Sequence, residues 1–254
     1  MIQASPVPHG YTLHRFPALA STNDECMRRA AAGAPHGTTV LAARQEAGRG
    51  RQGRCWHSPA GGLYLSVILR PELASQRQHY LPLAMGLALR QALATLSGLD
   101  IGLKWPNDIL WQGAKLAGIL VENVPARTCA GSGYAVVGLG VNLAGDAEAL
   151  SRTTGRLVTS LAAITGREWQ VMELVPPLLH QVEYWYRELA QGPEALLAGW
   201  RLHDVCPGLE LQWHQDDGTV LRGVALGLDN SGAYRIRTVT GTEVQVLAGD
   251  LLPA

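Results

Sequence analysis

Residues 48 to 54 read Gly-Arg-Gly-Arg-Gln-Gly-Arg, and this segment limits the fold more than any other part of the chain. It follows an apolar run at 39 to 43 that is typical of a strand, and its glycines have the G-x-G-x-x-G spacing of a dinucleotide-binding turn. Such a turn must open a helix, but Trp56, Pro59 and further glycines follow at once. We therefore reject a dinucleotide-binding fold, and no Gly-Lys-Ser/Thr ends the segment as a Walker loop requires.

The composition of the same segment is typical of an anion-binding loop. Glycine lets the backbone approach a ligand closely, and each arginine offers a planar fork of donors suited to phosphate or carboxylate. A solvated basic turn explains the segment equally well when it is taken alone. Further motifs are needed to separate the two interpretations.

Two downstream segments supply such motifs. Lys-Trp-Pro-Asn-Asp occupies 104 to 108, and Lys-Leu-Ala-Gly-Ile-Leu-Val-Glu occupies 115 to 122. The residues between them predict a hairpin with Gln112-Gly113 at its tip. This hairpin would hold the first lysine of each segment close to the other.

Together these motifs resemble those of biotin protein ligases. Ser-Thr-Asn at 21 to 23 and Gly-Leu-Gly-Val-Asn at 138 to 142 are also similar to that family, and the five motifs occur in the family's order. The resemblance implies an ATP-dependent enzyme that acts in two steps. Biotin and ATP would give biotinyl-5'-adenylate and pyrophosphate, with Mg²⁺ accompanying the nucleotide. The biotinyl group would then pass to one lysine of the biotin carboxyl carrier protein domain of a carboxylase.

The resemblance also implies roles for individual residues. Arg51 and Lys115 would be catalytic, because cations fixed around the α-phosphate stabilise charge that develops there. The biotin-binding residues would be Ser21, Thr22, Asn23, Gln45, Arg49, Gly50, Arg51 and Lys115. The residues that bind ATP and the adenylate would be Arg51, Arg54, Trp56, Asn107, Asp108, Lys115 and Asn142, with Mg²⁺ near Asp108 and no metal bound by protein groups alone.

Each motif also has a purely structural explanation. Residues 21 to 23 could cap a helix that ends near Gly33, and 105 to 108 could be only a turn. Lys115 could be a solvated charge at the start of a strand, and the glycines of 138 to 142 could serve close helix packing. Only the joint occurrence of the motifs favours the functional interpretation.

The order of expected elements indicates an α/β (α+β) protein with one mixed sheet flanked by helices. Strands are expected near 39–43, 63–70 and 134–141, and helices near 25–32, 79–97, 168–190 and 193–203. Residues 1 to 20 are expected to be only a short lead. The resemblance implies the catalytic fold shared by biotin ligases and class II aminoacyl-tRNA synthetases, over residues 1–205.

Short strands separated by glycine-containing turns fill residues 206–254. Four strands are expected at 209–213, 220–228, 233–237 and 243–247, with turns at 216–218, 229–232 and 240–241. The pattern predicts a small β-barrel, and the resemblance implies that it is SH3-like. Its expected role is to help dock the acceptor protein or ATP.

Composition restricts the class of function. The chain has 254 residues and a formal net charge of zero, which argues against general nucleic-acid binding. The long apolar stretch at 81 to 96 is interrupted by polar residues and is too short to span a membrane. The four cysteines of the chain are isolated and form no zinc motif, which favours a reduced, cytoplasmic protein.

Some members of the resembled family carry an N-terminal helix-turn-helix domain and repress biotin operons. Only residues 1 to 20 precede Ser21, so we expect a ligase without repressor activity and without a nucleic-acid partner. A lipoate or octanoate ligase and a nucleic-acid-binding regulator are the alternatives. A homodimer paired through 135 to 141 or through a sheet edge also stays open.

Overall fold

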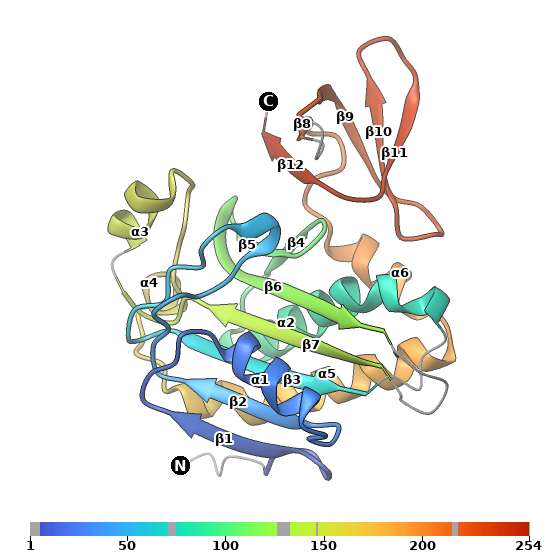
Figure 1. The fold of residues 1–254 in the computed structure, drawn as a ribbon. Coiled ribbons are helices and arrows are strands. Elements are labelled where there is room, and N and C mark those ends of the chain that lie inside the picture. Colours follow the sequence, from blue (N-terminus) through green and yellow to red (C-terminus); the bar gives the residue numbers. More distant parts are fainter. Residues whose placement is uncertain (1–5, 71–74, 126–132, 146, 215–217, 254) are drawn as a thin grey trace.

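A computed structural model describes residues 6–70, 75–125, 133–145, 147–214 and 218–253 of the chain. A large mixed sheet carries helices on both faces, and a separate antiparallel sheet forms the C-terminal part (Figure 1). This arrangement confirms the predicted mixed sheet with flanking helices and the small C-terminal β-structure.

The large sheet has the strand order β1-β2-β3-β7-β6-β5-β4. Its strands are β1 (Thr12–Phe16), β2 (Thr38–Ala42), β3 (Leu63–Leu69), β4 (Gly102–Lys104), β5 (Asp108–Trp111), β6 (Ala114–Val124) and β7 (Tyr134–Val141). Only β1 and β2 run parallel; the other neighbours are antiparallel. The three strands predicted before residue 142 are confirmed as β2, β3 and β7. Because β7 lies between β3 and β6, the expectation that 135 to 141 could pair two subunits is wrong.

Strand β1 corrects the expectation that residues 1 to 20 are only a lead. It pairs with β2 at the edge of the sheet, from Thr12 opposite Thr38 to Phe16 opposite Ala42. None of its five side chains is fully buried. An edge strand of this kind lacks the apolar run that marks a buried strand.

The helices are α1 (Thr22–Ala31), α2 (Leu81–Ser97), α3 (Ala147–Thr154), α4 (Leu161–Thr165), α5 (Val171–Gln191) and α6 (Glu194–His203). Helices α2 and α5 pack on each other behind the sheet (Figure 1). The other face is covered by α1, where Cys26 and Ala30 contact a small core that includes Ile68 and Val136. The sheet thus has a large core on one face and room for a site beside α1 on the other.

Side chains of β3 alternate between these two faces. Leu65 and Val67 belong to the large core, whereas Ile68 belongs to the small core under α1. The period of two therefore directs Ser66 to the α1 face as well, and its hydroxyl lies 2.6 Å from Asn23 Oδ1.

Strands β4, β5 and β6 form a meander that confirms the predicted hairpin. Gln112 and Gly113 connect β5 to β6, both with positive φ (47° and 81°), as a tight two-residue turn requires. The lysines at 104 and 115 lie near each other, as expected. Burial, and to a smaller extent the positive charge of Lys115, lowers the pKa of Lys104.

The C-terminal sheet has the strand order β11-β10-β9-β8-β12. Its strands are β8 (Glu210–His214), β9 (Val220–Leu228), β10 (Tyr234–Thr238), β11 (Glu243–Val246) and β12 (Asp250–Pro253). The four predicted strands are confirmed, and β12, which pairs with β8, was missed. This small antiparallel sheet is consistent with an SH3-like domain. The turn expected at 216–218 lies partly outside the described residues, and Cys129 lies outside them.

Asp204 lies where α6 leads into the C-terminal sheet. Its Oδ1 accepts a hydrogen bond from the Cys206 N–H at 3.1 Å, and burial raises its pKa from 3.8 to about 6. A carboxyl whose pKa is higher in the folded state stabilises the fold at low pH and loses that contribution as the pH rises through the folded pKa.

Replacing Asp204 by Asn should therefore stabilise the protein increasingly as the pH rises. The asparagine keeps the acceptor for Cys206 but cannot ionise. Between pH 4.5 and 7.5, the free energy of unfolding of Asp204→Asn relative to the parent should increase by about 2 kcal/mol. Urea unfolding at the two pH values measures this difference. An equal difference at both values would show that Asp204 ionises as freely in the folded chain as in the unfolded one.

Candidate active site

A cavity of about 460 Å³ opens on the α1 face of the large sheet. Every residue predicted for the site lines it: Ser21, Thr22, Asn23, Gln45, Arg49, Gly50, Arg51, Arg54, Trp56, Asn107, Asp108, Lys115 and Asn142. They come from the start of α1, from residues 48–54 (the glycine-arginine loop) and the residues that flank this loop, from the β4–β6 meander and from the end of β7. Residues separated by more than a hundred positions in the sequence therefore meet in one place.

The end of the cavity beside α1 is a network of hydroxyl and amide groups that includes one carboxylate, that of Glu122. Thr22 donates from its backbone N–H and its hydroxyl to Gln45 Oε1, at 2.8 and 3.1 Å. Asn23 donates from Nδ2 to Glu122 Oε2 at 2.9 Å, and its Oδ1 faces the hydroxyl of Ser66. The network fixes which atoms of these amides face the cavity.

Ser21 confirms the capping explanation for the first motif. It is the N-cap of α1, and its hydroxyl accepts from the Asp24 N–H at 3.4 Å. The cap also sets the direction in which the next two side chains leave the helix start. Capping and lining the cavity are thus compatible for residues 21 to 23.

The glycines of β6 and β7 allow side chains to lie directly on the backbone. A Cβ at Gly138 would press against Asn23 Oδ1 and lie 3.0 Å from Asn23 Cγ. Gly118 and Gly140 are register partners, and a Cβ on either would come within 3.0 Å of the Trp56 ring. The expectation of close helix packing thus holds for Gly138, whereas the other two glycines accommodate the indole.

The three arginines of the loop are fixed to three different walls. Arg49 pairs with Asp24 at 2.5 Å and with Glu122 at 2.7 Å. Arg51 Nη1 donates to Asn107 Oδ1 at 3.3 Å, and Arg54 Nη2 donates to an oxygen of Asp250 at 3.0 Å. The loop is therefore tied across the cavity rather than exposed as a solvated basic turn.

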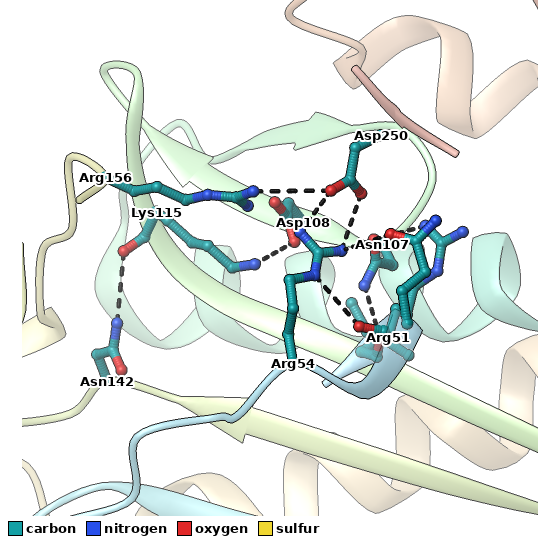
Figure 2. A network of polar contacts seen from close by, with 10 residues as sticks. Arg51, Arg54, Asn107, Asp108, Lys115, Asn142, Arg156 and Asp250 are labelled. Atoms are coloured by element: carbon teal, nitrogen blue, oxygen red, sulfur yellow. Dashed lines mark hydrogen bonds and ion pairs between the residues drawn. The ribbon is translucent and has the colours of Figure 1, made fainter. Parts of the chain in front are cut away.

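Lys115 lines the cavity, and its ammonium donates to Asp108 Oδ1 (Figure 2). The same ammonium lies 5.3 Å from the centre of the Trp56 ring. Only 19% of its side chain is exposed, which rules out the solvated strand-edge explanation. The Asn142 amide reaches the Lys115 carbonyl at 3.4 Å and the Thr159 carbonyl at 3.1 Å, so it fixes the backbone behind the lysine.

Two charged residues at the wall of the cavity beside Arg54 were not predicted from the sequence. Asp250 of β12 accepts from Arg54 and forms an ion pair with Arg156 at 3.6 Å (Figure 2). Burial acts to raise the pKa of Asp250, but the Arg54 hydrogen bond and the neighbouring arginine charges outweigh it and lower that pKa. Asp250 is therefore a charged carboxylate that links the C-terminal sheet to the cavity.

Ser66 and Glu122 were also missed. Ser66 is the single polar residue of an otherwise apolar strand, a signal that was available in the sequence. Glu122 ends the predicted 115 to 122 motif, but its contacts with Asn23 and Arg49 depend on the fold. Neither Arg156 nor Asp250 stands in a recognisable motif.

Within the described ranges, no three His, Cys, Asp or Glu side chains are grouped as a metal site would require. None of the helices that the structure describes is long and apolar enough to cross a membrane. Cys26 and Cys206 are buried free thiols, and Cys55 is an exposed free thiol that lines the cavity.

Comparison with known proteins identifies the class. The profile of the biotin/lipoate A/B protein ligase family matches residues 16–142. The biotin–acetyl-CoA-carboxylase ligase of Paracoccus denitrificans is 34% identical over 233 residues, covering 88% of this chain and 93% of the relative. The corresponding ligase of Mycobacterium tuberculosis is 32% identical and covers 91% and 85%. The solved biotin protein ligase from Aquifex aeolicus in complex with biotin and ATP has a TM-score of 0.79 at 27% identity, covering 94% and 97%.

The chain belongs to the biotin/lipoate A/B protein ligase family. Within that family it is a biotin ligase, because the two relatives from Paracoccus denitrificans and Mycobacterium tuberculosis, which match most of its length at more than 30% identity, carry that activity in their names. The resemblance stated from the motifs is thereby confirmed.

Proposed function

We propose that this enzyme carries out protein biotinylation in two steps, with all the cavity residues predicted from the sequence in the roles given there. Biotin and ATP form biotinyl-5'-adenylate and pyrophosphate, and the biotinyl group then passes to a lysine of a biotin carboxyl carrier protein domain. The observation that carries this proposal is one cavity that joins a network of hydroxyl and amide groups to a cluster of fixed cations around Lys115.

The polar network beside α1 suits the ureido ring of biotin. A ureido group has two N–H donors and one carbonyl acceptor, so its partners must both donate and accept. Thr22, Asn23 and Gln45 offer hydroxyl and amide groups there, with Ser21 at the helix cap. The backbone of Arg49 and Gly50 would cover the ring from the loop.

The cations suit the reacting groups. In the first step, a biotin carboxylate oxygen forms a bond to the α-phosphorus, and pyrophosphate leaves with the electron pair of the broken P–O bond. Lys115 and Arg51 would stabilise the charge that develops on the α-phosphate oxygens. Arg54, Trp56, Asn107 and Asn142 would hold the nucleotide.

Mg²⁺ would bind together with ATP, and Asp108 provides the type of ligand that this ion prefers. Asp108, whose Oδ1 accepts from Lys115, would hold the ion together with the nucleotide. When bound, Mg²⁺ supplies positive charge that offsets the charge of the triphosphate.

The rest of the molecule fits the same proposal. Residues 1–205 would form the biotin- and ATP-binding domain, and residues 206–254 a C-terminal domain that reaches the cavity through Asp250. We propose a cytoplasmic enzyme that does not act as a DNA-binding repressor, consistent with its zero net charge and free thiols. A homodimer that forms by strand pairing would use a sheet edge such as β1.

Transfer from isolated biotinyl-5'-adenylate tests the two-step sequence. The enzyme is incubated with a carrier domain and the adenylate, without ATP, and the carrier mass is measured. We expect biotin on a single carrier lysine, and no labelling of a carrier in which that lysine is arginine. Labelling that requires ATP even when the adenylate is supplied would contradict the sequence of steps.

A further inference from the structure

Arg156 enters the nucleotide end of the cavity from the segment that follows α3. This segment is hydrogen-bonded to the strand that carries Lys115. The Leu157 carbonyl accepts from the Lys115 N–H at 2.9 Å, and the Thr159 N–H donates to the Lys115 carbonyl at 2.9 Å. The backbone beside Arg156 is therefore fixed relative to Lys115, although α3 itself has no buried residue.

The guanidiniums of Arg156 and Arg54 meet at one carboxylate oxygen, Asp250 Oδ2. Arg54 reaches it from the glycine-arginine loop, and Arg156 reaches it from the segment that follows α3 (Figure 2). Both arginine side chains are 38% exposed and both residues line the cavity. A guanidinium has five N–H donors, so the contact with Asp250 leaves each arginine able to donate to a ligand as well.

The charges at this end do not cancel. Asp250 carries one negative charge and stands between two arginines, and Asp108 is engaged with Lys115. One positive charge therefore remains at the Arg54–Arg156 pair. Two guanidiniums held side by side at one carboxylate and lining the same cavity suit the oxygens of a phosphate chain, which accept bidentate hydrogen bonds.

We propose that Arg156 is a further catalytic residue, which binds the β- and γ-phosphates of ATP together with Arg54 and stabilises the departing pyrophosphate. This inference rests on the proposed function. As the biotin carboxylate bonds to the α-phosphorus, the bond from that phosphorus to the β-bridging oxygen breaks. The electron pair of that bond leaves with pyrophosphate, and Arg156 stabilises the negative charge that accumulates on it. Asp250 is a positioning residue that aligns the two arginines.

Arg156→Gln tests the proposal against Arg152→Gln as the matched control. Arg152 belongs to α3, is 70% exposed, pairs with Glu148 at 3.6 Å, and does not line the cavity. For Arg156→Gln we expect the KM for ATP and the inhibition constant of pyrophosphate to rise about tenfold or more. Biotin affinity and transfer from supplied biotinyl-5'-adenylate should stay within about twofold of the parent, because neither involves pyrophosphate. Arg156→Lys should recover part of the loss.

Two results would overturn the assignment. Adenylation kinetics of Arg156→Gln equal to those of Arg152→Gln would show that Arg156 does not meet the nucleotide. Equal losses in adenylation and in transfer from the adenylate would show that it only supports the fold through Asp250. A parent enzyme without biotin-dependent adenylation would instead contradict the proposed function. In that case, the ATP affinities of Arg156→Gln and the parent, measured by calorimetry, still show whether Arg156 binds the nucleotide.

Discussion

Replacing Lys115 by alanine is expected to lower kcat for adenylation by about 10²- to 10³-fold, while the Kd for biotin changes by less than about tenfold. The ammonium is fixed by Asp108 and lies over Trp56, so it is positioned before the substrates arrive. Its charge matters most when negative charge builds up on the α-phosphate in the transition state. Single-turnover formation of the adenylate and calorimetric biotin binding separate the two effects.

The double variant Lys115→Ala, Asp108→Asn controls for the carboxylate that the single substitution leaves unpaired. The Asp108 side chain is only 13% exposed, so its isolated charge could disturb the cavity. If adenylation returns in the double variant, the loss came from that carboxylate. A single variant that loses biotin affinity but keeps kcat would make Lys115 a ground-state contact.

Gly138→Ala is expected to weaken biotin binding by about ten- to a hundredfold, because the new methyl group must displace Asn23. The added Cβ would lie 3.0 Å from Asn23 Cγ and closer still to its Oδ1. Asn23 is 4% exposed, and moving it breaks its contacts with Ser66 and Glu122. ATP affinity should change little, since the atoms nearest to the new methyl group all belong to Asn23 and not to a residue assigned to ATP. Calorimetry with each ligand measures both affinities.

A double-mutant cycle shows whether the effect passes through this asparagine. In an Asn23→Ala background the amide is gone, so Gly138→Ala should have almost no additional effect on biotin affinity. An undiminished effect in that background would mean that Gly138 contributes in some other way, for example through the strand backbone.

The parts of the fold that could be predicted from sequence are those with strong local signals. The buried strands β3 and β7 are apolar runs that only Ser66 of β3 interrupts with a small polar side chain, and the β5–β6 turn has its two residues in the left-handed region. The strands β1 and β12 lack such signals. Each is a short edge strand that is fixed by a partner elsewhere, β2 for the first and β8, far back in the sequence, for the second. The short helices α3 and α4 were missed because α3 buries no residue and α4 spans only five.

The candidate site likewise contains residues that a local sequence signal predicts and residues that no local signal predicts. Its predicted residues lie in compact motifs, where several unusual residues stand side by side in the sequence. Arg156 and Asp250 are single charged residues in unremarkable segments, and only the packing of β12 and of the segment after α3 brings them together. Contacts between distant segments bring such residues into the site, and no local sequence pattern predicts them.

Biotin-dependent exchange of labelled pyrophosphate into ATP, with lipoate as the parallel substrate, tests the central claim most directly. Exchange reports the reversible first step alone, without an acceptor protein. We predict exchange with biotin, none with lipoate, and a large loss of the biotin-dependent rate in the Lys115→Ala variant. Exchange with lipoate but not with biotin, or exchange with neither acid, would contradict the proposal that this cavity forms biotinyl-5'-adenylate.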